Sequence, residues 1–239
     1  MNGSTEPRKR FFACDFHVHT PASDCFQGPR GNWCIKMLLQ CKQNGVEMIA
    51  ITDHNSIDGY AEFTKKKNDL LSFHQRLIQE IDNHPECRRL LKKCEEEIAL
   101  FDRCQVLPGI EYEAKPGVHL LFVFPPTLKT DQLLDFLKRG GYPNEHQGVE
   151  DPPLRGAWEV LDAIDQAAEL GGICIAAHAD SDKGIYNTVR SGAYRADIFK
   201  SEHLFAIAFN SINTAKKMMS LLEQPQYKRQ SPLAFIQCS

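Results

Sequence analysis

The sequence lacks the features that would place it among membrane, secreted or duplex-binding proteins. It has no apolar run long enough to cross a bilayer and no apolar signal segment ahead of its first cysteine. Neither sign of charge dominates, because the formal net charge is -3, so the broad basic surface of a duplex-binding protein is absent. The 239 residues, 42% of them hydrophobic, predict one globular domain over residues 11–239 after a flexible tail over residues 1–10.

The cysteines do not form a disulfide pattern. There are nine, their number is odd, and no two stand in a CxxC pair. Such a set favours reduced thiols. We therefore expect a protein of the cytoplasm without a membrane partner.

Several common enzyme motifs are also missing. The chain contains no Gly-x-Ser-x-Gly, no P-loop and no GxGxxG. No catalytic motif of this kind therefore marks Ser23, Ser181 or a cysteine as a nucleophile.

Strand-like apolar runs alternate with helical periodicities along the chain. After a first strand that contains His17, the predicted strands cover residues 46–52, 105–113, 118–124, 173–178, 204–209 and 233–239. Helical spacing covers residues 33–43, 131–139, 157–170 and 214–222, and a helical hairpin occupies about residues 56–104. The order predicts an α/β barrel or a doubly wound sheet. Because the link at 114–117 is too short for a parallel crossover, the strands beside it should pair antiparallel.

Residues with metal-binding chemistry stand at or just after the predicted strand ends. They are His17, His19, His54, Glu111, His119 and His178. In an α/β barrel these ends meet at one rim, where such folds build their active sites. Imidazoles with a carboxylate suit Zn, Mn or Fe better than Mg or Ca, and one carboxylate can bridge two cations.

Other polar residues receive weaker predictions. Asp15 and Asp53 stand beside candidate ligands, so their carboxylates could accept hydrogen bonds from imidazole N–H groups. Arg155 and Lys183 could contact a substrate anion, although a solvated surface role suits most such side chains. The loop at 140–155 is long enough to cover a site. The remaining histidines, which are His74, His84, His146 and His203, fit ordinary surface roles.

With these residues in place, the chain resembles the polymerase and histidinol phosphatase (PHP) superfamily of metal-dependent phosphoesterases. The first motif resembles DFHVHT at residues 15–20 with Asp24 downstream, and the second resembles ITDHN at 51–55. The third resembles PGIE at 108–111 followed by HLL at 119–121, and the fourth resembles AAHAD at 176–180. The resemblance covers about residues 11–239.

The resemblance implies a distorted seven-stranded (β/α) barrel of the TIM-like type holding two to three divalent metal ions. His17, His19 and Glu111 would serve the first metal, and Glu111, His119 and His178 the second. Asp24 and His54 would serve the third.

The superfamily closes its site with Asp-x-His after the last barrel strand, whereas the strand LAFIQCS here runs to Ser239. We therefore expect a chain cut before that motif, with its first and third metal sites incomplete. The AHAD form of the fourth motif is similar to PHP domains that precede an ATPase module, so such a module is an expected partner.

The function that the resemblance implies is hydrolysis of a phosphomonoester, nucleotide or nucleic-acid end by a metal-activated water. A non-catalytic PHP module that binds nucleotide or supports an attached ATPase is the alternative. Metal-dependent hydrolysis of a C–N bond on a similar barrel is a third possibility.

Overall fold

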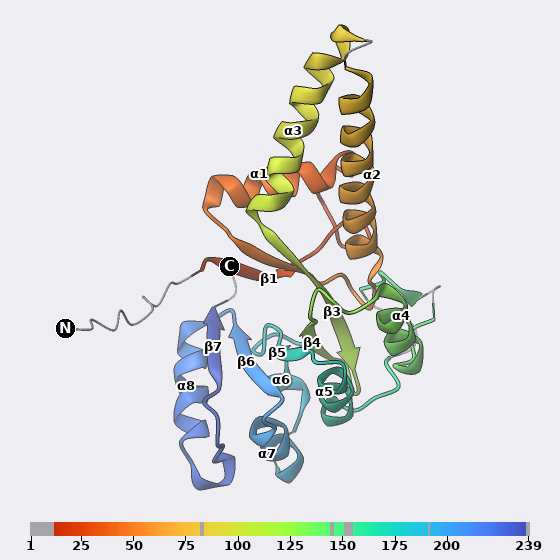
Figure 1. Cartoon of the computed structure of the whole chain (residues 1–239). Coiled ribbons are helices and arrows are strands. Elements are labelled where there is room, and N and C mark those ends of the chain that lie inside the picture. The colour runs from red at the N-terminus through yellow and green to blue at the C-terminus, as the bar shows by residue number, and fades with distance from the viewer. Residues whose placement is uncertain (1–11, 82–83, 144–145, 151–154, 191, 238–239) are drawn as a thin grey trace, which may run out of the picture.

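The computed structural model describes residues 12–81, 84–143, 146–150, 155–190 and 192–237 (Figure 1). The tail predicted over residues 1–10 lies outside this range. Seven strands follow one another across a single sheet. They are β1 (Cys14–Val18), β2 (Met48–Ile51), β3 (Gln105–Ala114), β4 (Val118–Val123), β5 (Ile173–Ala176), β6 (Leu204–Phe209) and β7 (Ala234–Gln237).

Helices connect most of these strands. They are α1 (Trp33–Asn44), α2 (Asp58–Glu80), α3 (Arg88–Arg103), α4 (Thr130–Arg139), α5 (Val160–Glu169), α6 (Ile185–Thr188), α7 (Ala193–Lys200) and α8 (Ile212–Leu222). Among the described residues there are also two short 3-10 turns, η1 (Pro85–Cys87) and η3 (Pro225–Tyr227). The sequence patterns missed α6 and α7, because helices this short show no clear hydrophobic period.

The strand directions follow the lengths of the links between them. β3 pairs antiparallel with β4, as the short link at 114–117 predicts, and β4 also pairs antiparallel with β5. The other neighbouring strands are parallel. Because β4 is reversed, its first residues lie at the edge of the sheet where the parallel strands end.

The sheet is curled into a half-barrel. Within the described residues β1 and β7 are its two edges and do not pair with each other, so the closed seven-stranded barrel that we expected appears as an open, curled sheet. β1 and β7 nevertheless line one cavity of about 540 Å³ between them. The inside of the curl is filled by small and medium side chains: Leu121, Ile175, Ala177, Ala206 and Ala208, with Phe16 against them.

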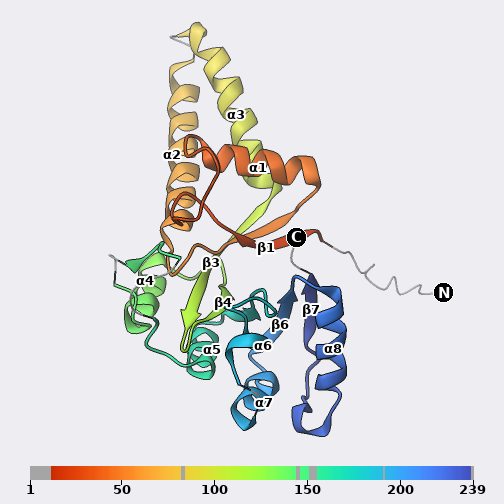
Figure 2. The same cartoon turned by 180° about the vertical axis from the view of Figure 1, so that it is seen from behind.

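A helical hairpin stands away from the sheet (Figures 1 and 2). It consists of α2 and α3, which pack together through the Phe63 and Phe101 rings, 5.0 Å apart. The hairpin that the sequence predicted between residues 56 and 104 therefore exists, and its status as an insertion into a barrel stays a prediction. No helix in the described ranges combines the length and apolar character that a membrane span requires.

The largest core cluster lies between the sheet and its C-terminal helices. Side chains such as Tyr112, Phe122 and Phe136 are fully buried there. Burial of large aromatic side chains on this scale is a main source of folding free energy. This packing holds β3 and β4, which carry the central residues of the site.

Candidate metal centre

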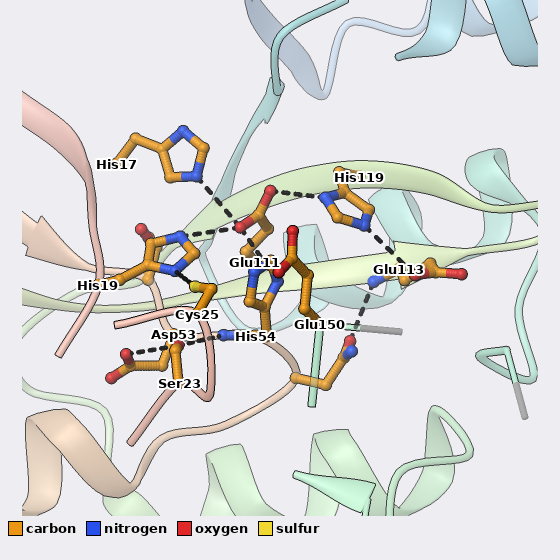
Figure 3. Close-up of polar contacts among 12 residues, drawn as sticks. His17, His19, Ser23, Cys25, Asp53, His54, Glu111, Glu113, His119 and Glu150 are labelled. Atoms are coloured by element: carbon orange, nitrogen blue, oxygen red, sulfur yellow. Dashed lines mark hydrogen bonds and ion pairs between the residues drawn. The ribbon is translucent and has the colours of Figure 1, made fainter. Parts of the chain in front are cut away.

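One buried carboxylate lies at the centre of the site. The Glu111 side chain is only 1% exposed, and five imidazole nitrogens approach its two oxygens. Figure 3 shows Glu111 with the rings of His17, His19, His54 and His119 around it. The five rings belong to the histidines predicted at the rim, namely His17, His19, His54, His119 and His178. The structure therefore brings together all six rim residues that the sequence indicated.

The two carboxylate oxygens face different rings. Oε2 lies 3.1 Å from His17 Nε2 and 2.9 Å from His19 Nε2, and it lies 3.2 Å from His54 Nδ1. Oε1 lies 2.8 Å from His119 Nδ1 and 3.0 Å from His178 Nε2. This division agrees with the first and second metal sites that the resemblance implies, and the ligand roles themselves remain predictions.

The strands place these side chains around the Glu111 carboxylate in two ways. His17, His19 and His178 come from the ends of β1 and β5, as expected for parallel strands. Glu111 and His119 do not follow strand ends: Glu111 lies inside the long strand β3, and His119 is the second residue of the reversed strand β4. The antiparallel register, which pairs Glu113 with His119, carries both to the same rim.

The segment after β2 is fastened to β3 by the backbone. The Asn55 amide donates to the Glu111 carbonyl at 2.8 Å, and the Glu111 amide donates to the Asp53 carbonyl at 3.1 Å. Asn55 adopts a left-handed conformation with φ 46, and its side-chain oxygen accepts the Glu113 amide at 2.9 Å. Asparagine tolerates this conformation better than most residues do, so it suits this turn. The turn places His54 Nδ1 3.2 Å from Glu111 Oε2.

The donor set suits cations better than a purely hydrogen-bonded cluster. A carboxylate has about four lone-pair positions, but five imidazole nitrogens approach this one. Two ligands that each lie about 2.1 Å from one ion are about 3.0 Å apart when they subtend a right angle. The observed separations of 2.8 to 3.2 Å fit such shared coordination. The residues present therefore fit Zn, Mn or Fe, as nitrogen-rich sites with a carboxylate do.

Charge and burial set the protonation of the rings. Burial alone would lower the pKa of His119, but its hydrogen bonds to Glu111 and Glu113 carry that pKa to about 9. Burial lowers the pKa of His54 to about 4 against the opposing attraction of Glu111. Although burial raises the pKa of the Glu111 carboxyl, hydrogen bonds from the surrounding imidazoles hold it well below its usual range.

A second buried carboxylate, Glu113, supports the first. Its Oε2 lies 3.3 Å from His119 Nε2, while Arg155 Nη1 donates to Oε1 at 2.9 Å and Lys183 Nζ lies 3.4 Å from Oε2. No motif in the sequence marked Glu113. The Glu-x-Glu spacing on β3 could have revealed it, because alternate residues of a strand share a face.

His178 also has a supporting partner. Its Nδ1 lies 2.7 Å from Ser181 Oγ, which leaves Nε2 directed at Glu111. A partner of this kind fixes the ring orientation of a metal-binding histidine. Ser181 therefore can orient the His178 ring.

The two aspartates proposed to orient imidazoles have other partners. The Asp53 carboxylate is fully buried and accepts hydrogen bonds from the Thr20 amide, the Thr20 hydroxyl and the Ser23 hydroxyl, each at 2.7 Å. The exposed Asp15 carboxylate accepts the backbone amide of His17 at 3.0 Å. Asp53 anchors the loop after β1, and this hydrogen bond of the Asp15 carboxylate is with the backbone of His17 and not with an imidazole.

The loop at 140–155 reaches the site through its described residues 146–150. The Gly148 amide donates to the His54 carbonyl at 2.7 Å, and the Glu150 amide donates to Asp24 Oδ1 at 3.0 Å. Glu150 lines the pocket together with the rim histidines and Lys183, and this pocket has a volume of about 540 Å³. Lys183 Nζ donates to the Glu150 carbonyl at 2.8 Å.

Asp24 and His54 do not share one group of donor atoms. Three ligand atoms of His19, Cys25 and His54 lie within 4.8 Å of one another, and so do those of Asp24, Cys25 and Glu150. Cys25, which belongs to both groups, and Glu150 were missed by the sequence analysis. No motif marked either residue, because the fold of two loops brings them together.

The four histidines assigned to surface roles have other partners in the structure. His74 lies 3.7 Å from Glu95 on the helical hairpin, and His84 lies 3.1 Å from Glu86 at its end. His203 lies 3.1 Å from Asp165, and the His146 amide donates to the Pro143 carbonyl. None of them contributes to the donor groups found among the described residues.

Together these features define a carboxylate-centred candidate metal site at the rim of an α/β half-barrel. Comparisons with known proteins find no matching family model and no matching curated protein. Similar solved structures do exist. One is a protein of Bifidobacterium adolescentis whose assignment as a metal-dependent phosphoesterase is itself inferred, with 15% identity, a TM-score of 0.49, and coverage of 88% of this chain and 83% of that one.

Two further structures are similar. A two-domain protein of Bacteroides vulgatus, which contains an inferred PHP-like metal-dependent phosphoesterase, has 16% identity and a TM-score of 0.41, with coverage of 82% of this chain and 43% of that one. An amidohydrolase of Chromobacterium violaceum, with bound sulfate and no metal, has 13% identity and a TM-score of 0.49, with coverage of 94% and 87%. Likeness at this distance assigns no function, which depends on the chemistry of the site.

Proposed function

We propose that the protein is a metal-dependent hydrolase that acts as a phosphoesterase on a phosphomonoester, a nucleotide or a nucleic-acid end. The observation that supports this most is the division of the Glu111 oxygens between two sets of imidazoles. A carboxylate placed between two sets of nitrogen ligands is suited to bridge two cations. Two cations held by one carboxylate would suit the displacement of an oxygen leaving group from phosphorus.

Some of these residues would bind the metal ions, and others would orient the metal-binding side chains. His17, His19, His119 and His178 would hold two divalent ions on Glu111, and Ser181 would orient His178. Bound divalent ions would supply Lewis acidity and lower the pKa of a water molecule toward neutrality. Glu113 would keep His119 in place from the other side of its ring.

Positive charge near the pocket would favour an anionic substrate. Lys183 lines the pocket with its side chain 27% exposed, so its ammonium group could contact a phosphate while remaining near Glu113. Arg155 is 52% exposed and bonds to the same carboxylate, which makes it a weaker candidate. These two cations favour a phosphoester over a neutral amide as the substrate.

No side-chain nucleophile is required in this proposal. The Ser181 hydroxyl contacts His178, and the Ser23 hydroxyl donates to the buried Asp53. Water held between the metal-binding residues would attack the phosphorus atom instead. Action in the cytoplasm, beside an ATPase module, belongs to the same proposal.

The test is an activity assay on the full-length natural protein. Metal is removed with a chelator, Mn²⁺ or Zn²⁺ is restored, and hydrolysis is followed with p-nitrophenyl phosphate, bis(p-nitrophenyl) phosphate, nucleotides and an amide substrate. We expect phosphoester hydrolysis that requires metal. His119→Ala should lower it by more than about 100-fold, because loss of even a supporting partner of a ligand costs about 10–100-fold.

His203→Ala is the matched control, because it removes an imidazole that lies outside the donor groups. It should leave the rate within about twofold of the unmodified protein. Absence of turnover on every phosphoester with metal restored, or equal rates in both variants, would refute the proposal. Nucleotide binding without turnover would favour the non-catalytic alternative, and turnover of the amide alone would favour C–N bond hydrolysis.

A further inference from the structure

A thiol lies among the imidazoles on one side of the site. Cys25 Sγ is 3.1 Å from His19 Nδ1, and the His19, Cys25 and His54 ligand atoms lie within 4.8 Å of one another. The carboxylates of Asp24 and Glu150 form a second group around the same sulfur. Figure 3 shows Cys25 below His19, with His54 and Glu150 alongside.

The set of donors around this sulfur differs from the set around Glu111. Among the described residues, the side chains that contact the Glu111 carboxylate are imidazoles, whereas the donors around Cys25 include sulfur, nitrogen and carboxylate oxygen. Zinc sites commonly combine thiolate, imidazole and carboxylate ligands in fourfold coordination.

We propose that Cys25 is a metal ligand, and that its thiolate and the His54 imidazole, which belong to one group of donor atoms, contribute to a thiolate-containing cation position next to the Glu111 centre. The thiol releases its proton to solvent when the cation binds. His19, whose Nε2 faces Glu111, directs its Nδ1 at the bound sulfur. The inference rests on the proposed function in placing metal at Glu111, and it adds a residue that the superfamily resemblance does not supply.

The thiolate gives this position a selectivity that an oxygen and nitrogen site would lack. Soft thiolate ligands favour Zn²⁺ and Co²⁺, whereas Mg²⁺ and Ca²⁺ prefer all-oxygen shells. The centre should therefore retain one zinc-type ion that Mg²⁺ does not displace. A thiol that only orients the His19 ring would give no such preference and no bond to metal.

Cobalt(II) distinguishes these two roles without any activity assay. The metal-free protein is titrated with Co²⁺, and the near-ultraviolet charge-transfer band of a cobalt–thiolate bond is recorded. We expect the band in the unmodified protein and in Cys14→Ser, which removes an exposed thiol on β1. The band should be lost in Cys25→Ser, which keeps the side chain nearly the same size, and added Zn²⁺ should abolish it in the unmodified protein.

Alkylation of the unmodified protein provides a second measurement that does not depend on a variant that folds. Peptide mapping follows the reaction of iodoacetamide with Cys25 and Cys14 in the metal-free, Zn²⁺-loaded and Mg²⁺-treated protein. Zn²⁺ should slow the modification of Cys25 by at least about tenfold, because a coordinated thiolate is shielded from the reagent. Mg²⁺ should not protect Cys25, and neither ion should protect Cys14.

A cobalt–thiolate band that persists in Cys25→Ser, no band in the unmodified protein, or alkylation of Cys25 at the same rate with and without Zn²⁺ would overturn the proposal. The band and the protection do not require turnover. Both signals without phosphoester hydrolysis would refute the proposed function alone. Hydrolysis without either signal would refute only the role of Cys25.

Discussion

Glu111→Gln tests whether one carboxylate organises the site. The substitution keeps the shape of the side chain but removes the negative charge that five imidazoles approach. In the metal-free protein the clearest consequence should appear at His119, which contacts Glu111 through Nδ1 at 2.8 Å and Glu113 through Nε2 at 3.3 Å. Burial opposes protonation of this ring, so its positive charge depends on the two carboxylates.

The structure gives the magnitude. The pKa of His119 is about 9, compared with an ordinary value of 6.5. At about 1.4 kcal/mol for each pH unit, this difference corresponds to about 3 kcal/mol of extra stability when the ring is charged. Because the folded pKa is raised, this stability is fully present below pH 6.5 and is lost as the pH rises through 9.

Two measurements check this prediction on metal-free protein. NMR titration should show the His119 pKa near 9 in the unmodified protein and at or below about 6.5 in Glu111→Gln, because burial is then opposed by Glu113 alone. Urea unfolding should show that Glu111→Gln costs about 3 to 5 kcal/mol at pH 6.5, the usual loss when one partner of a buried charge pair is removed. This loss should become smaller toward pH 9.

Glu113→Gln is the matched control. Glu113 also contacts Arg155 and Lys183, and its oxygen lies farther from the His119 ring, so its removal should lower the His119 pKa less. A His119 pKa that stays near 9 in Glu111→Gln, or that falls more in Glu113→Gln, would refute the central role of Glu111.

Three further predictions concern other parts of the site. Metal-free protein should lose about 3 kcal/mol of stability as the pH falls from 6.5 to 4, because burial lowers the pKa of His54 to about 4 and the unfolded ring therefore binds a proton first. Urea unfolding should show a weaker pH dependence in His54→Gln, and an unchanged dependence would contradict the prediction. Gly59→Ala should cost about 1–3 kcal/mol in thermal or urea unfolding, because the new methyl group would collide with the Asp53 carboxylate and the Thr20 hydroxyl, which anchor the loop after β1. Gly31→Ala is the control and should have little effect, because a methyl group there would meet no atom within 4 Å. Ser181→Ala should weaken Zn²⁺ binding by about 10–100-fold in a competition titration, because the His178 ring loses its positioning partner; equal affinity would show that Ser181 is not needed.

The candidate ligands could be predicted largely from local sequence patterns. His17 and His19 stand at the end of a strand of alternating residues, and His178 follows a short buried apolar run. Such positions depend on the two-residue period of a strand and on the tendency of parallel strand ends to share one rim. The antiparallel pairing of β3 and β4 was also predictable, since the link between them is too short for any other connection.

The partners of these ligands could not be predicted in the same way. Asp53 adjoins His54 in the sequence, yet its carboxylate bonds to Thr20 and Ser23, because the loop after β1 folds back on the end of β2. Cys25 and Glu150 are 125 positions apart and share a donor group only because residues 146–150 cross the site. Hydrogen bonds between loops depend on how those loops pack, and no local period records that packing.

The sequence by itself determined the order of the strands and of the longer helices, the reversal at β4 and the six rim residues, because these follow from backbone geometry and hydrophobic spacing over a few residues. Only the tertiary structure decided that Glu111 presents one oxygen to His17 and His19 and the other to His119 and His178. It also decided that the sheet stays open between β1 and β7 within the described residues, and that a thiol lies beside the imidazoles. These outcomes depend on the curl of the sheet and on contacts between distant segments, which form only when the whole core packs.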